Sequence, residues 1–86
     1  MKLEAIEPAL CHTSSQRALL ATVDVFKHGL STKEAAARLG ISKALVEQAC
    51  KTVPVIGNDL IEKIWNKEAT LTGVYNVKVR KYKGID

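Results

Sequence analysis

The sequence TKEAAARLGISKALVEQACK, residues 32–51, predicts two short helices joined by a tight turn. Ser31 precedes the first helix and Glu34 follows three residues later, which is the spacing of a capping box. Gly40 stands where the chain must turn, because glycine adopts a positive φ without steric cost. Ser42 can then cap the second helix. We therefore expect a helix-turn-helix, a unit that places its second helix in the major groove of DNA.

The apolar residues of both expected helices repeat at helical spacing. Ile41 fills the corner between them, and Ala36 is small enough for the two helices to cross close to the turn. The second helix is expected over residues 43–53. The buried face is expected to comprise Ala35, Ala36, Leu39, Leu45, Val46, Ala49, Cys50 and Val53. An ordinary antiparallel helical hairpin is the alternative interpretation.

The opposite side of the second helix is expected to read bases, because the first turns of such a helix face base edges. The candidate base-contacting residues are Lys43, Ala44, Glu47, Gln48 and Lys51. Gln48 can pair with adenine and Lys43 with guanine. Glu47 either accepts a hydrogen bond from cytosine or pairs with a lysine four residues away. The candidate phosphate contacts are Thr32, Lys33, Ser42 and Arg38, with a solvated position as the alternative for Arg38.

The segment GLSTKEAAARLGIS, residues 29–42, is similar in sequence to many bacterial helix-turn-helix regulators, including LuxR-type domains. The small size, the single preceding helix and the distinct tail resemble the short plasmid repressors of the TrfB/KorA and KorC kind. PapB-type regulators are a weaker likeness. The resemblance covers roughly residues 16–53. It implies a homodimer that represses its own and neighbouring promoters.

The segments around this unit also predict helices. Thr13, Ser14 and Ser15 offer caps for a helix that runs to about Lys27, and Gly29 ends it. Its buried stripe is expected to be Leu19, Leu20, Val23, Phe26 and Leu30. Pro8 suits the first turn of a short helix over residues 7–11. Pro54 stops the second motif helix, and Asn58 is expected to cap a helix over residues 59–67, with Leu60, Ile61, Ile64 and Trp65 on one face.

The tail changes its period. Alternation from Leu71 to Val79 predicts a strand with one apolar face. A lone strand leaves its backbone groups without partners, so we expect it to pair with the same strand of a second subunit. A winged arrangement with a hairpin near Gly73 is the alternative. The expected dimer contacts are Ile61, Ile64, Trp65, Tyr75, Val77 and Val79.

Length and charge agree with a small DNA-binding domain. The 86 residues suit one domain, mainly α with three to five helices, with its core at about residues 14–53 and its dimerisation region at 58–82. The net charge is +4, with four basic against two acidic residues over 32–53 and four against one over 70–86. This excess favours a polyanionic partner.

No pattern in the sequence indicates catalysis, a cofactor or a small-molecule ligand. Cys11 and Cys50 lack a CxxC spacing, and His12 and His28 belong to no ligand cluster, so no metal site is expected. No segment approaches the ~20 apolar residues of a membrane span, and a cytoplasmic, bacterial location is expected. The expected function is sequence-specific binding of double-stranded DNA by a homodimeric repressor on palindromic operators. The alternative is a helical adaptor that binds other proteins.

Overall fold

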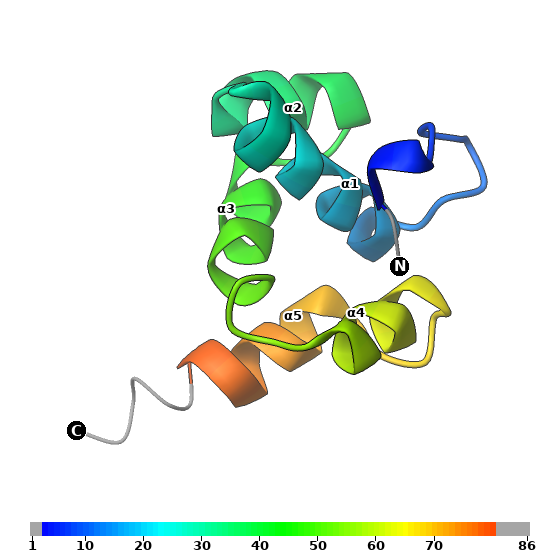
Figure 1. The fold of residues 1–86 in the computed structure, drawn as a ribbon, viewed down its shortest axis with the longest axis vertical. Coiled ribbons are helices and arrows are strands. Elements are labelled where there is room, and N and C mark those ends of the chain that lie inside the picture. Colours follow the sequence, from blue (N-terminus) through cyan, green and yellow to red (C-terminus); the bar gives the residue numbers. More distant parts are fainter. Residues whose placement is uncertain (1–2, 81–86) are drawn as a thin grey trace.

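The computed structural model describes residues 3–80, and every regular element in that range is helical (Figure 1). These elements are the 3₁₀ helix η1 (Leu3–Ala5), the α-helices α1 (Ser14–His28), α2 (Thr32–Leu39), α3 (Lys43–Thr52), α4 (Asn58–Trp65) and α5 (Leu71–Tyr75), and the π-type helix η2 (Asn76–Arg80). Helices α1, α2 and α3 pack on one another in all three pairs, while α4 and α5 both contact α1 and α5 also contacts α3. The predicted mainly α fold is confirmed.

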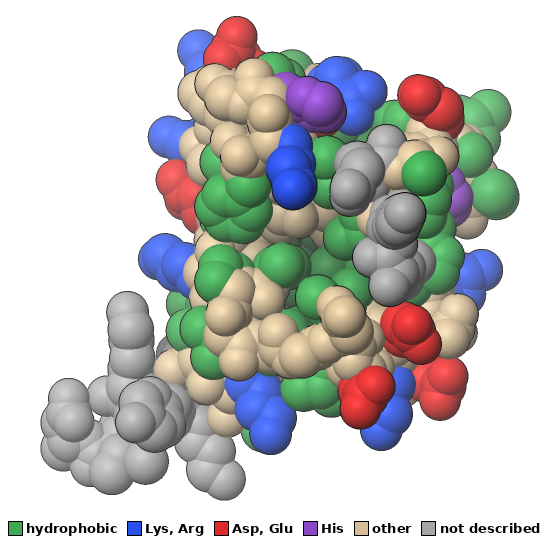
Figure 2. Space-filling model, in the orientation of Figure 1, with side chains coloured by type: hydrophobic (Ala, Val, Ile, Leu, Met, Phe, Trp, Pro, Cys, Tyr) green, Lys and Arg blue, Asp and Glu red, His purple; other side chains and the backbone are tan. Residues whose placement is uncertain are grey.

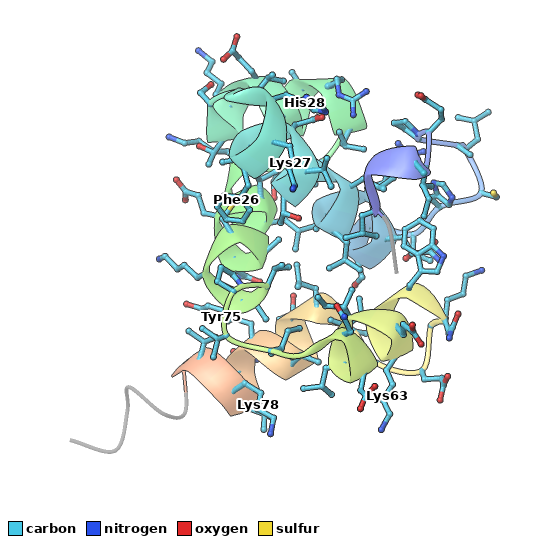
Figure 3. All side chains as sticks on the ribbon, viewed as in Figure 1. Phe26, Lys27, His28, Lys63, Tyr75 and Lys78 are labelled. Atoms are coloured by element: carbon cyan, nitrogen blue, oxygen red, sulfur yellow. The ribbon has the colours of Figure 1, made fainter. Side chains whose placement is uncertain are left out.

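Helix α1 forms the axis of the core. It begins with a capping box in which the Thr13 hydroxyl accepts from the Gln16 amide (3.2 Å) and Gln16 Oε1 accepts from the Thr13 amide (2.7 Å). Gly29 ends it in the left-handed conformation, with φ 71°. Its central turns are enclosed on all sides. Phe26 was predicted in the buried stripe but is 53% exposed, because it stands in the last turn beside the exposed Lys27 (Figure 3).

Helices α2 and α3 are joined as predicted. The Ser31 hydroxyl accepts from the Glu34 amide (3.1 Å), and Glu34 Oε1 accepts from the Ser31 amide (3.0 Å). Gly40 takes φ 69° after α2, and the Ser42 hydroxyl accepts from the Leu45 amide (3.2 Å) at the start of α3. The buried faces carry Ala35, Ala36, Leu39, Val46 and Ala49. The expected order of capped helix, glycine turn and capped helix is confirmed.

Two long-range hydrogen bonds attach the C-terminal helices to the start of α1. Gln16 Nε2 donates to the carbonyl of Trp65 (2.6 Å), and the Leu71 amide donates to the Ser15 hydroxyl (3.1 Å). The side chain of Leu71 is fully buried. The first turn of α1 therefore fixes both the end of α4 and the start of α5.

The N-terminal helix predicted over residues 7–11 is absent; η1 lies earlier in the chain, at Leu3–Ala5. Arg17 of α1 instead binds two carbonyl groups of this stretch. Its Nη2 donates to Ala9 O (2.8 Å), and its Nε donates to His12 O (3.3 Å). Ala9 O also accepts from the His12 amide (3.1 Å), so the stretch ends in a single turn.

Helix α4 differs from the prediction at both ends. Its N-cap is Gly57, with no side-chain capping hydrogen bond, and Asn58 is its first helical residue. Asp59 in the first turn still places a negative charge where the helix dipole favours it. The helix ends at Trp65 and does not reach residue 67, because Lys67 adopts φ 67°.

The strand predicted over residues 71–79 is wrong, since α5 and η2 occupy this segment and residues 3–80 contain no strand. Thr70 caps α5 by accepting from the Gly73 amide (3.0 Å), so the hairpin alternative at Gly73 is wrong as well. Leu71 and Val74 are buried three residues apart, at helical spacing. Val79 follows five residues later and is also buried, which fits the i→i+5 hydrogen bonding of a π-helix. Leu71, Val74 and Val79 are therefore covered within their own chain and need no partner strand, while Val77 stays exposed.

Candidate nucleic-acid interface

The outward side of α3 consists of four exposed residues, Lys43, Ala44, Glu47 and Lys51. They are exposed because the opposite side of the helix carries Val46 and Ala49, which are fully buried in the core with α1 and α2. Figure 2 shows basic and acidic side chains alternating along the edge of the molecule that α3 forms. Four of the five residues predicted to contact bases therefore share one exposed face.

Gln48, the fifth candidate, lies at the edge of this face and is half-buried. Its Oε1 accepts a hydrogen bond from the hydroxyl of Thr72 on α5 (3.3 Å). Its carbonyl accepts from the hydroxyl of Thr52 (2.7 Å), as a helical carbonyl can. The contact with Thr72 is not predictable from the sequence, because it joins residues 24 positions apart and the partner was assigned to a strand.

Glu47 forms an ion pair within its own helix. The Lys43 Nζ and Glu47 Oε2 atoms are 3.9 Å apart at i,i+4 spacing, and both side chains are about half exposed. Exposed pairs of this kind contribute only a few tenths of a kcal/mol, so either group can exchange its partner for a ligand. The geometry favours the intrahelical role that the sequence left open for Glu47.

Three of the four predicted phosphate contacts lie near helix starts. Lys33 is exposed in the first turn of α2, where Thr32 is half-buried, and Ser42 is exposed at the start of α3. The hydroxyl of Ser42 already accepts a hydrogen bond from the Leu45 amide, but its own proton is still available for donation to a phosphate. The Ser31 amide and hydroxyl bond to Glu34 and lower the pKa of its carboxyl, which keeps it charged at the same end of α2.

Arg38, the fourth predicted phosphate contact, is bound elsewhere. Its Nε and Nη2 atoms donate to the two carboxylate oxygens of Asp24 at 2.6 and 2.9 Å. The Asp24 side chain is 4% exposed and that of Arg38 45%. Hydrogen bonding to Asp24 is the main reason that the pKa of Arg38 is raised. Arg38 therefore ties α2 to α1 and neutralises the buried carboxylate of Asp24, which would be costly to leave unpaired. Its contact with phosphate stays a prediction.

Arg17 fixes the turn from the other side. Its Nη1 donates to the carbonyl of Leu39 (2.8 Å), the last residue of α2, just before Gly40. Sequence reasoning missed both Arg17 and Asp24. A signal existed for Asp24, because an acid that follows Leu20 by four residues lies inside the apolar repeat of α1 and needs a partner there. No comparable signal marked Arg17.

The residues predicted to form the dimer contact are divided by the fold. Ile61, Ile64 and Val79 are buried within the protomer and cannot reach a partner from that position. Trp65 is half-buried, with its ring 5.0 Å from that of His12. Tyr75 is half-buried, and Val77 is 59% exposed. Residues 81 and 82 of the expected dimerisation region lie outside the described residues.

Other candidate sites find little support. The side chains that the structure describes include no group of three His, Cys, Asp or Glu suited to a metal ion. Within the same range, no helix has the length and apolar character needed to cross a membrane. Cys50 is half-buried on α3, where burial raises the pKa of its thiol, and Cys11 is exposed.

The chain matches no protein-family model, and neither the curated proteins nor the solved structures include a significant match to it.

Proposed function

We propose that this protein is a bacterial, cytoplasmic transcriptional repressor that binds double-stranded DNA in a sequence-specific manner, as a homodimer on palindromic operators. The observation that carries the proposal is the outward face of α3, which is polar and exposed on a helix whose other side is fully packed. The turn before α3 is fixed by Gly40 and by the bond from Arg17 to Leu39. A fixed helix with an exposed polar face is what readout of a DNA groove requires.

Base recognition would come from α3 in the major groove, which is wide enough to admit one α-helix. Lys43 can donate to guanine O6 and N7, and Ala44 can contact the methyl group of thymine. Lys51 lies two turns further along the same face and can reach a base or a phosphate. Glu47 modulates Lys43 through their ion pair and can accept from cytosine when that pair opens.

Phosphate contacts would come from the start of α2 and from Ser42. Lys33 supplies positive charge there, and the amides at a helix start favour an anion. Glu34 opposes this attraction, since its charge lies in the same first turn. The net charge of +4 adds a longer-range attraction for DNA. Backbone contacts set the orientation of the protein, while specificity comes from α3.

A homodimer follows from the small reading surface. One recognition helix contacts only a few base pairs, so useful specificity needs two half-sites, with centres ~34 Å apart. Two copies related by a two-fold axis read a palindrome. A dimer bound at a promoter would then exclude polymerase, which is the basis for assigning repression.

Selection of binding sites from random DNA duplexes at 150 mM salt (about physiological) tests the proposal. We expect a palindromic site, and we expect Lys51→Ala to weaken binding to it by about 1–3 kcal/mol. Lys27→Ala is the matched control, because Lys27 is an exposed lysine in the last turn of α1 (Figure 3), away from α3 and from α4, and the change should leave affinity unchanged. Selection of no preferred sequence, or equal losses for the two variants, would contradict the proposal.

The adaptor alternative makes a different prediction. Retention on heparin or random DNA with a steep salt dependence is expected of a DNA-binding protein and not of a protein-binding module. Weak retention that is independent of salt would favour the adaptor.

A further inference from the structure

An apolar groove crosses the surface between α4 and the C-terminal helices. It has a volume of about 390 Å³ and is lined mainly by Leu60, Ala69, Val74 and Val77, with Lys78 at its rim. Among the side chains that the structure describes, no other charged one lines it. Apolar surface is unfavourable in water, so burying this groove against a partner would contribute favourably to association.

The groove lies beside an apolar projection. Val77 is 59% exposed and forms part of the groove wall, so one patch carries both a hollow and an apolar side chain that stands out from it. A surface with both features can meet a copy of itself across a two-fold axis, each projection entering the hollow of the other protomer. We propose that this groove is the contact between two copies of the chain, with Val77 of each copy seated in the groove of the other.

Charges around the groove allow this self-association. Lys78 stands at the rim on η2. Helix α4 carries the exposed acids Asp59 and Glu62 and the exposed Lys63, which leaves it a net charge of −1. A two-fold contact places η2 of one protomer against α4 of its partner, so Lys78 approaches a helix of opposite net charge, and a weak electrostatic attraction adds to apolar burial.

The position of the groove singles out a second copy as its occupant, and this step rests on the proposed function. The protomer is 37 Å long, and α4, α5 and η2 lie at one end of that axis, while α3 lies midway along it (Figure 1). Two protomers joined at that end place their α3 helices about one protomer length apart. This separation is close to the ~34 Å between successive major-groove half-sites. The outward face of α3 stays uncovered.

Analytical ultracentrifugation of the full chain tests the contact. The unaltered protein should be a dimer at micromolar concentration, and Val77→Asp should raise the dimer dissociation constant at least ~100-fold, because it buries an unpaired charge. Val55→Asp is the matched control: Val55 is 62% exposed in the α3–α4 link, outside the groove, and the constant should stay within ~3-fold. A monomeric unaltered protein, free and on DNA, or a Val77→Asp variant that stays dimeric, overturns the proposal.

A second measurement needs no variant. In a mixture of isotope-labelled and unlabelled protein, filtered NOE spectra should connect the Val77 methyl groups of one copy to those of Leu60 or Ala69 in the other. Dimers without these cross-peaks would place the interface elsewhere and overturn the proposal.

The outcomes for the contact and for the function are distinguishable. If the dimer forms through the groove but binds no specific DNA, the proposed function fails and the contact stands. If the unaltered protein is a monomer and binds a half-site with the same affinity as the Val77→Asp variant, DNA binding stands and the contact fails.

Discussion

The hydroxyl of Thr72 donates to Oε1 of Gln48 at 3.3 Å, so α5 holds the side chain of a residue at the edge of the outward face of α3. This leaves the Nε2 group of Gln48 as its free end. A glutamine held in this way can donate to a base, and its two-way contact with adenine is disfavoured because the bond from Thr72 uses one of the two lone pairs of Oε1 and restricts its orientation. We therefore expect Gln48 to favour an acceptor, such as guanine N7 or O6, in place of adenine.

Thr72→Val tests this expectation, because valine keeps the shape and removes the hydroxyl. At the base contacted by Gln48, preference should shift toward adenine by about 1–3 kcal/mol in competition binding assays. Thr72→Ser is the control and should keep the original preference, since it keeps the donor. Unchanged preference in Thr72→Val would show that α5 does not govern the readout by Gln48.

Lys33→Ala should weaken binding to every DNA sequence alike, because a phosphate contact carries no sequence information. The slope of log affinity against log salt should flatten by about one unit. Titrations of operator and random duplexes at several salt concentrations measure both effects. A loss confined to the operator would mean that Lys33 touches a base.

Arg38→Ala should destabilise the fold rather than remove a DNA contact. The change leaves the buried carboxylate of Asp24 without its partner, and we expect a loss of about 1–3 kcal/mol in unfolding free energy. Replacing both residues, as Asp24→Asn with Arg38→Met, should cost less than Arg38→Ala alone. Urea unfolding of the unaltered protein and the two variants measures these losses, and an unchanged unfolding free energy with lower DNA affinity would instead support the phosphate role.

Much of the fold was accessible from the sequence because its signals are local. Ser31 with Glu34, Gly40, and Ser42 each act within a single turn, and the structure has each in the expected role. The outward residues of α3 followed from the same spacing. Thr13 with Gln16 was an equally local capping box, but only its first residue was recognised.

The parts that were missed depend on contacts between distant residues. Asp24 with Arg38, and Arg17 with Leu39, join separate elements, and periodicity carries no information about such pairs. The tail shows the same limit. Its alternation and its Val and Tyr content favour a strand, yet packing against α3 and α1 decides for helix, as tertiary contacts override weak local preference.

The capping carboxylate of Glu34 should make stability depend on pH. Because the folded state lowers its pKa, the carboxylate stabilises the fold fully above its ordinary value of 4.5, and this contribution is lost as the pH falls through the lowered value. Glu34→Gln keeps an acceptor for the Ser31 amide but cannot titrate. The two proteins should therefore differ most near neutral pH and converge in acid, as followed by denaturant unfolding. A constant difference at all pH values would contradict this role.

The helical tail separates two valines that the strand interpretation places on one face. Val79 is 8% exposed and Val77 59%, whereas period-2 alternation would bury them equally. We expect Val79→Ala to cost about 1–2 kcal/mol of unfolding free energy, since it removes buried methyl groups and leaves a cavity. Val77→Ala should cost less than about 0.5 kcal/mol in the same measurement, because its side chain is largely solvated in the protomer. Both must be measured at concentrations low enough that unfolding does not depend on protein concentration, so that association does not contribute. Equal losses for the two variants, with strand-type chemical shifts over residues 71–79, would return the tail to the strand that its sequence pattern predicts.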